Sequence, residues 1–169
     1  MFLSPVARGI FFVSSYNPLY FIFLILNFGK SNTLYLEVFF ISLILGSSFM
    51  LWLVFEQVKH VDGDYKTFTE VENINKINLE YFVVYLIPFL TIDLFGLRED
   101  LALLILFAIM GFMYVRSDSI YMNPMFTIFG LNIYRVKANS EEFIVISKHL
   151  NKKETEQIKR LTSGVFVSL

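Results

Sequence analysis

The chain contains no cysteine and only two histidines among its 169 residues. Without cysteine it can form no disulfide, hold no thiolate metal site and present no thiol nucleophile. His60 and His149 each lie beside a lysine and have no second ligand or carboxylate to work with, so we interpret both as surface residues. The sequence also lacks a glycine-rich phosphate loop and the HExxH and GxSxG motifs. We therefore expect no enzymatic activity, no cofactor and no metal site.

Apolar residues, by contrast, are abundant. They make up 56% of the chain, with 20 phenylalanines, and the mean hydropathy is +0.60. A small soluble core cannot bury this much apolar side chain. Charged residues avoid four runs, at about 6–28, 33–55, 80–96 and 100–115, and about 20 residues are needed to cross a hydrocarbon core. The sequence therefore predicts an α-helical polytopic membrane protein, with four transmembrane helices within 1–115, a cytoplasmic loop at 56–79 and a small cytoplasmic α+β layer at 116–169.

Lysine and arginine are concentrated on one side of this predicted membrane domain. Four crossings place both termini and the loop 56–79 on the same side, which holds four basic residues near the membrane: Arg8, Lys59, Lys76 and Arg116. The opposite side holds Lys30 and Arg98. Because cytoplasmic loops carry an excess of such residues, both termini are predicted to be cytoplasmic.

The first apolar run is interrupted by the polar stretch SSYNP at residues 14–18. Pro18 removes the amide that would bond the Ser14 carbonyl, and hydrocarbon cannot satisfy that acceptor. We predict a kink whose polar side chains bond the backbone locally or reach a neighbouring helix with small residues. The residues assigned to the kink and its packing are Ser14, Ser15, Asn17 and Pro18, together with Gly46, Ser47 and Ser48 of the second run.

Charged residues also gather near the opposite, outer membrane surface. They are Glu37, Asp93, Arg98, Glu99 and Asp100. Two interpretations stay open: solvation of the helix ends, with Asp100 capping the fourth helix, or a sensing or ion site at the outer surface. Asp93 also favours an ion channel or transporter as an alternative function, because an acidic residue inside an apolar run is a functional candidate.

The predicted cytoplasmic parts combine strands with short helices. In the loop, YKTFTEVENI alternates in the manner of a strand. In the tail, Asn123 and Pro124 predict the start of a short helix that stops at Gly130. LNIYRVKA, EEFIVISK and GVFVSL predict three strands.

Asn151 and Glu154 have the spacing of a capping box, which predicts a helix through about Leu161. At about 50 residues, the whole layer should have little core of its own and should depend on the membrane helices, sister subunits or a partner.

Basic residues of the tail are candidates for docking a partner. Nucleic acid is a poor match for them, because Glu154 and Glu156 are interspersed and no aromatic ladder accompanies them, so we predict no direct nucleic-acid binding. The lipid bilayer itself is a predicted partner. The candidate docking residues are Tyr134, Arg135, Lys152, Lys153, Lys159 and Arg160.

Several segments resemble one known family. SSYNPL, EYFVVYLIPF and the run YMNPMFTIFGLNIYRV leading into FIVISK are similar to the KwaA family, the membrane subunits of the bacterial Kiwa anti-phage defence system, and the similar layout covers nearly the whole chain. The resemblance implies an inner-membrane protein that senses phage infection and works with a cytoplasmic, DNA-binding effector subunit, KwaB. We therefore expect a homo-oligomeric sensor or scaffold, with a tetramer favoured, that docks this effector. The alternative is a small oligomeric ion channel or transporter.

Overall fold

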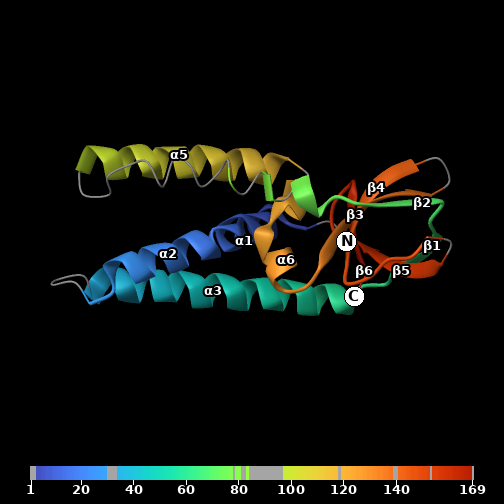
Figure 1. Ribbon diagram of the computed structural model, residues 1–169, viewed down its shortest axis with the longest axis horizontal. Coiled ribbons are helices and arrows are strands. Elements are labelled where there is room, and N and C mark those ends of the chain that lie inside the picture. The colour runs from blue at the N-terminus through green and yellow to red at the C-terminus, as the bar shows by residue number, and fades with distance from the viewer. Residues whose placement is uncertain are drawn as a thin grey trace.

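The computed structural model describes residues 3–29, 34–77, 79–80, 83, 97–117, 119–138, 141–152 and 154–168. Helices form one end of the elongated molecule and a sheet forms the other (Figure 1). The long helices are α1 (Pro5–Ser15), α2 (Asn17–Asn27), α3 (Leu34–Lys59) and α5 (Leu97–Arg116). The 3-10 helix η1 (Ser119–Met122) and the short α6 (Pro124–Ile128) lead from α5 to the sheet.

The prediction of four transmembrane helices is wrong for the residues that the structure describes. Only α3 is by itself long and apolar enough to cross a membrane, and α1 with α2 makes a second candidate span only if the pair is counted together across a 43° bend. The apolar part of α5, Leu101–Arg116, is shorter than a span. Most of the predicted run 80–96 lies outside the described residues. An apolar run is not always one span: in this α+β fold the first run is divided between α1 and α2, and the apolar part of the fourth is too short.

The bend between α1 and α2 follows from the polar stretch at their junction. α1 begins with Ser4 as its N-cap, whose Oγ accepts a hydrogen bond from the Ala7 amide at 3.1 Å. α2 restarts at Asn17, so Pro18 lies in its first turn, where a missing amide removes no intrahelical bond. The predicted single helix over 6–28 is therefore two helices separated at Tyr16.

The sheet has six strands: β1 (Asp64–Thr67), β2 (Glu70–Asn73), β3 (Asn132–Ala138), β4 (Glu141–Ser147), β5 (Thr155–Arg160) and β6 (Val165–Ser168). Their order is β1-β5-β6-β4-β3-β2. β4 and β6 are parallel, and every other neighbouring pair is antiparallel.

The two edge strands, β1 and β2, are consecutive in sequence and are separated only by Phe68 and Thr69. Three residues span at most about 11 Å, so the sheet must curl until its edges approach each other. We call Phe68 and Thr69 the seam. Phe68 is fully buried, and the Thr69 amide donates to the Lys137 carbonyl at 2.9 Å.

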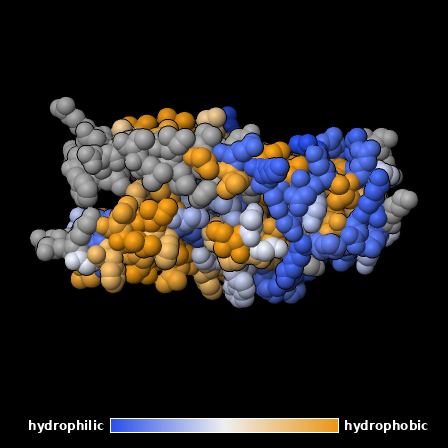
Figure 2. Space-filling model, viewed as in Figure 1, coloured by the Kyte–Doolittle hydropathy of each residue, from blue (hydrophilic) through white to orange (hydrophobic). Residues whose placement is uncertain are grey.

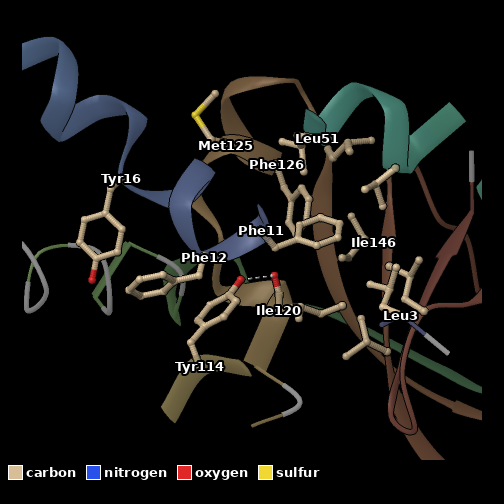
Figure 3. Close-up of a cluster of buried hydrophobic side chains, with 14 of the residues drawn as sticks. Leu3, Phe11, Phe12, Tyr16, Leu51, Tyr114, Ile120, Met125, Phe126 and Ile146 are labelled. Carbon is tan, nitrogen blue, oxygen red and sulfur yellow. Dashed lines mark hydrogen bonds between the residues drawn. The ribbon is translucent and has the colours of Figure 1, made fainter. Parts of the chain in front are cut away.

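Side chains of the central strands alternate between two hydrophobic clusters. Ile146 points toward the helices, where it joins the cluster of Phe11, Leu51 and Phe126 (Figure 3). Val165 and Val167 belong to the same cluster. The opposite face of the sheet has a second cluster, drawn from the sheet, the seam and Leu150: Phe68, Tyr134, Val136, Ala138, Phe143, Val145, Leu150, Ile158 and Phe166. The expectation that this layer has little core of its own is therefore wrong, because the curl supplies one.

The tail follows several sequence-based predictions and breaks one. α6 begins after Asn123, and Gly130 lies just beyond its end with φ of +74°, which confirms the predicted start and stop. The strands β3, β4 and β6 are likewise confirmed. The helix predicted after Asn151 is wrong, because this segment forms β5. Asn151 does donate to Glu154 at 3.0 Å, but the two side chains bond each other ahead of a strand.

Candidate functional site

Buried polar side chains connect the helices to one another and to α6. We call this set the polar junction, and it consists of Ser14, Asn17, Ser47, Ser48 and Asn123. Ser14, Asn17, Ser47 and Asn123 are each at most 8% exposed, although apolar residues surround them. Buried polar groups need hydrogen-bond partners, so the junction specifies how the elements fit together.

Asn17 links α2 to α3 through both ends of its side-chain amide. Its Nδ2 donates to Ser48 Oγ at 3.0 Å, and its Oδ1 accepts from Ser47 Oγ at 2.7 Å. The structure thus brings together residues from the two polar stretches singled out in the sequence. Gly46 precedes them on α3 and has no atom within 4 Å of where a Cβ would lie.

Ser14 and Ser15 satisfy the backbone at the end of α1. Their hydroxyls donate to the carbonyls of Phe11 at 2.9 Å and Phe12 at 2.6 Å. Such bonds to the preceding turn are typical of serine near a helix bend.

Asn123 links α6 to α1, a role that the sequence analysis missed. Its Nδ2 lies 2.9 Å from both the Phe11 carbonyl and Ser14 Oγ, and its Oδ1 accepts from the Met125 amide at 2.9 Å. The sequence signal was present, because an N-cap asparagine uses only its oxygen for capping and keeps its amide available. Its partners on α1 are more than 100 positions away.

Aromatic rings of α1, α5 and α6 belong to the hydrophobic cluster beside these residues (Figure 3). The Phe11 ring makes edge contacts with Phe55 of α3, at 6.0 Å between centroids, and with Phe126 of α6, at 5.7 Å. Tyr114 Oη donates to the Ile120 carbonyl at 3.1 Å, which fixes the turn between α5 and η1. The junction therefore lies where α1 and α2 meet α3 and α6.

The chemistry of the junction suits a conformational role. Hydroxyl and carboxamide groups exchange hydrogen-bond partners but do not change charge at physiological pH. Among the residues that the structure describes, no three His, Cys, Asp or Glu side chains lie close enough to hold a metal ion.

The predicted outer-surface residues are only partly described. Glu37 lies in the first turn of α3, and its Oε1 accepts from the Gly29 amide at 3.1 Å. Arg98, Glu99 and Asp100 lie in the first turn of α5, at the end of the helical layer away from the sheet (Figure 1). Asp93 lies outside the described residues.

The predicted docking residues do not form one surface. The prediction that Tyr134 docks a partner is wrong. Tyr134 belongs to the second hydrophobic cluster and is only 7% exposed, so its ring is not available to a partner. Arg135 forms ion pairs with Glu72 at 3.3 Å and Glu142 at 3.2 Å across the neighbouring strands. Lys152 is exposed, and Lys153 lies outside the described residues.

The last two predicted docking residues lie on β5. Lys159 Nζ donates to the Lys59 carbonyl at the end of α3, where a cation favours the helix dipole. Arg160 donates to the carbonyls of Thr162 at 3.1 Å and Ser163 at 3.2 Å. Lys159 is therefore part of the connection between helix and sheet.

Together these features define an α+β protein in which an apolar helical layer, held together by buried hydrogen bonds, packs against a curled sheet. The sequence model described as the anti-phage protein KwaA matches residues 7–167. The chain therefore belongs to the KwaA family of anti-phage proteins. The resemblance to this family, and with it the prediction of a component of anti-phage defence, is confirmed at the level of the family.

A curated relative agrees with this assignment. The Kiwa protein KwaA of Escherichia coli O55:H7 (strain RM12579 / EPEC) is 29% identical over 59 residues, which cover 35% of this chain and 30% of the relative. The matched segment thus spans less than a third of that relative's length. No solved structure matches the chain.

Proposed function

We propose that this chain is a membrane-attached subunit of an anti-phage defence complex, with a non-catalytic role. In this proposal α3 and the bent α1–α2 pair lie in the inner membrane, and the curled sheet forms a cytoplasmic layer on which an effector subunit docks. The observation that carries the proposal is the exposure of α3.

α3 is apolar but hardly buried. Its 26 residues extend for about 39 Å, which is sufficient for a hydrocarbon core of about 30 Å. Only 17% of its apolar window is buried, and Leu45, Phe49 and Trp52 are each more than half exposed. Figure 2 shows hydrophobic residues over the described helices and hydrophilic residues over the sheet. An exposed apolar surface of this extent is typical of contact with a membrane or another protein.

Basic residues support a cytoplasmic sheet. Arg8 near the start of α1, Lys59 at the end of α3 and Arg116 at the end of α5 all lie at the ends of the helices next to the sheet (Figure 1). The Arg8 guanidinium donates to the Val115 carbonyl at 3.2 Å, which brings two of these ends together. Lysine and arginine are enriched on the cytoplasmic side of membrane helices, so the sheet and the N-terminus belong on that side.

Fractionation and cysteine labelling test this proposal directly. Because the chain has no cysteine, each introduced cysteine is the only one. We expect the protein to stay in alkali-washed membranes. An impermeant maleimide should label Leu34→Cys, at the far end of α3, in intact cells, and should label Ser163→Cys, next to β6, only after the cells are opened. Recovery in the soluble fraction, or labelling of Ser163→Cys in intact cells, would refute the proposal.

Docking of the effector is tested separately. The Kiwa system suggests KwaB as the partner, and exposed Lys152 is the clearest basic candidate on the sheet side. Lys152→Glu should reduce co-purification of KwaB and protection against phage while the protein remains in the membrane. The matched control is Lys76→Glu, which reverses another exposed lysine. Equal loss of KwaB from both variants would show that general charge, and no particular surface, controls the association.

Self-association, with a tetramer favoured, and the sensing of infection stay predictions, as does the channel alternative, whose residue Asp93 is not described.

A further inference from the structure

A cavity of about 650 Å³ lies between the second half of α3 and the sheet. One part of its lining is aromatic and comes from Trp52 and Phe55 of α3 and Phe129 after α6. The other part is polar and comes from the ends of β4, β5 and β6: Ser147, Lys148, His149, Glu156 and Ser168. Its volume is within the range of ligand sites in proteins, and a site with one apolar and one polar part suits an amphiphile.

At the polar part of the cavity, two side chains are available to bind a ligand, because the other charged groups already have partners. Lys59 pairs with Glu56 at 2.8 Å, and Glu156 accepts a hydrogen bond from Ser168 Oγ at 3.1 Å. In the part of the chain that the structure describes, the side chains of Lys148 and His149 have no hydrogen-bond or ion-pair partner. An ammonium and an imidazole on consecutive residues that line the same cavity offer the donors that a phosphate oxygen requires.

The aromatic part is continuous with the exposed face of α3. Trp52 is 55% exposed and stacks on Phe49, with 5.9 Å between ring centroids. Tryptophan is enriched at the level of lipid headgroups, where its ring is partly apolar and partly hydrated. A chain lying along this face of α3 would enter the cavity and bring its polar end to Lys148.

We infer that this cavity binds a phospholipid, with its phosphate at Lys148 and His149 and its acyl chains against Trp52 and Phe55. The inference rests on the proposed membrane attachment. A free phosphate would use only the polar part and gain nothing from the aromatic lining, which is why the lipid is favoured. Bound there, the lipid would contact α3 and the ends of three strands at once.

Native mass spectrometry of the full chain, released from membranes in mild detergent, tests the inference. We expect phospholipid adducts on the wild type and about a tenfold lower occupancy in Lys148→Glu, which replaces a charge-assisted hydrogen bond with repulsion. Lys152→Glu is the matched control, because Lys152 is exposed but does not line the cavity. Equal adduct loss in both variants would overturn the inference, since it would reflect surface charge alone.

A second pair of variants tests the aromatic part. Trp52→Ala should lower occupancy, whereas Phe39→Ala should not, although Phe39 is equally exposed on α3 at 54%. Wild-type protein in nanodiscs of phosphatidylglycerol and phosphatidylcholine should keep its adduct in the presence of millimolar inorganic phosphate. Displacement by inorganic phosphate, or equal occupancy in Trp52→Ala and the wild type, would contradict a lipid as the occupant. Fractionation reports attachment independently: a chain found in the soluble fraction refutes the proposed function, whereas a membrane-bound chain without adducts refutes only the lipid site.

Discussion

The helical layer and the curled sheet differ in the polar side chains that they bury and in the apolar side chains that they expose. In the helical layer Ser14, Asn17 and Asn123 are buried, while Phe49 and Trp52 are exposed. In the sheet the buried residues are mostly apolar, and the exposed ones form cross-strand ion pairs: Glu70 with Lys137, and Glu72 and Glu142 with Arg135. A helix in water buries its apolar side, whereas a helix in lipid gains nothing from doing so and uses polar contacts and close packing instead. This contrast is the one expected if, as proposed, the helices lie in lipid and the sheet in water.

The strongest way to separate the two regions is to remove the seam. Phe68→Ala should lower the free energy of unfolding of the sheet by about 4 kcal/mol, because removing a fully buried ring leaves a cavity. The cluster around Phe68 contains no residue of the helices. Limited proteolysis in membranes should show cleavage of the sheet while the protein stays membrane-bound. Tyr65→Ala, on an edge strand and 72% exposed, is the control and should resist cleavage like the wild type. Loss of the chain from the membrane in Phe68→Ala would show that the regions are not independent.

The next largest effect is expected at Asn123, which ties α6, the segment that leads into the sheet, to α1. Asn123→Ala should lower stability by about 2 kcal/mol, because the bonds to α1 and the cap of α6 are lost together. Thermal unfolding in detergent measures this change. Asn123→Asp keeps the capping oxygen but replaces the donors with a buried carboxylate facing the Phe11 carbonyl, so it should be destabilised at least as much as Asn123→Ala. If Asn123→Asp unfolds like the wild type, the bonds to α1 contribute nothing.

Close packing in the helical layer can be tested at two glycines. A Cβ at Gly111 of α5 would lie 2.9 Å from the Phe12 ring, which Phe107 and Tyr16 already hold at centroid distances of 4.8 and 5.1 Å. Both Gly111→Ala and Gly46→Ala gain the higher helix propensity of alanine, so this gain cancels in the comparison. Because of the contact with Phe12, Gly111→Ala should be less stable than Gly46→Ala by about 1.5 kcal/mol. Equal melting temperatures for the two variants would mean that α1 and α5 can separate without cost.

A smaller effect is expected from the hydrogen bond between α2 and α3. In a double-mutant cycle, Asn17→Ala and Ser47→Ala should show a coupling energy of about 0.6 kcal/mol, the value typical of such bonds between membrane helices. Ser42→Ala is the control, because the Ser42 hydroxyl bonds the Val38 carbonyl of its own helix at 2.7 Å. Additive effects of Asn17→Ala and Ser47→Ala would argue against a bond between the helices.

The smallest effect is expected on the outer face of the sheet. The hydrogen bond to Glu70 raises the pKa of Lys137 above its usual value. Because the folded-state pKa is the higher one, this contribution is complete below the unfolded pKa of lysine and is lost as the pH rises through the folded pKa, in the alkaline range. Glu70→Gln should therefore change the melting temperature slightly at pH 8, and by less as the pH rises through the folded-state pKa of Lys137. If the difference in melting temperature between the wild type and Glu70→Gln grew with pH, it would contradict a stabilising ion pair between Glu70 and Lys137.

Local signals predicted part of this fold. Asn123, Pro124 and Gly130 place the start and stop of α6 because capping and positive φ depend on neighbouring residues. β5 could not be predicted in this way, because its sequence TEQIKR has one apolar residue, Ile158, and becomes a strand through pairing with β1 and β6.

The site shows the same division between local and distant information. The polarity of the SSYNP stretch is visible in the sequence, but the partners of Ser14 and Asn17 lie 109 and about 30 positions away. Tyr134 was misplaced for a similar reason, since the face of the sheet that it occupies became an interior only when the sheet curled.

The link between α3 and β1 has a mechanical consequence. Only residues 60–63 separate Lys59 from β1. Lys159 holds the helix end, and at Gly63 a Cβ would lie 3.0 Å from the Ile158 carbonyl, so this linker has little room to stretch or fold. A piston movement of α3 would therefore pull β1 along β5. Because a slip by one residue turns every side chain of a strand to the other face, such a movement must either be resisted or change the register in a discrete step.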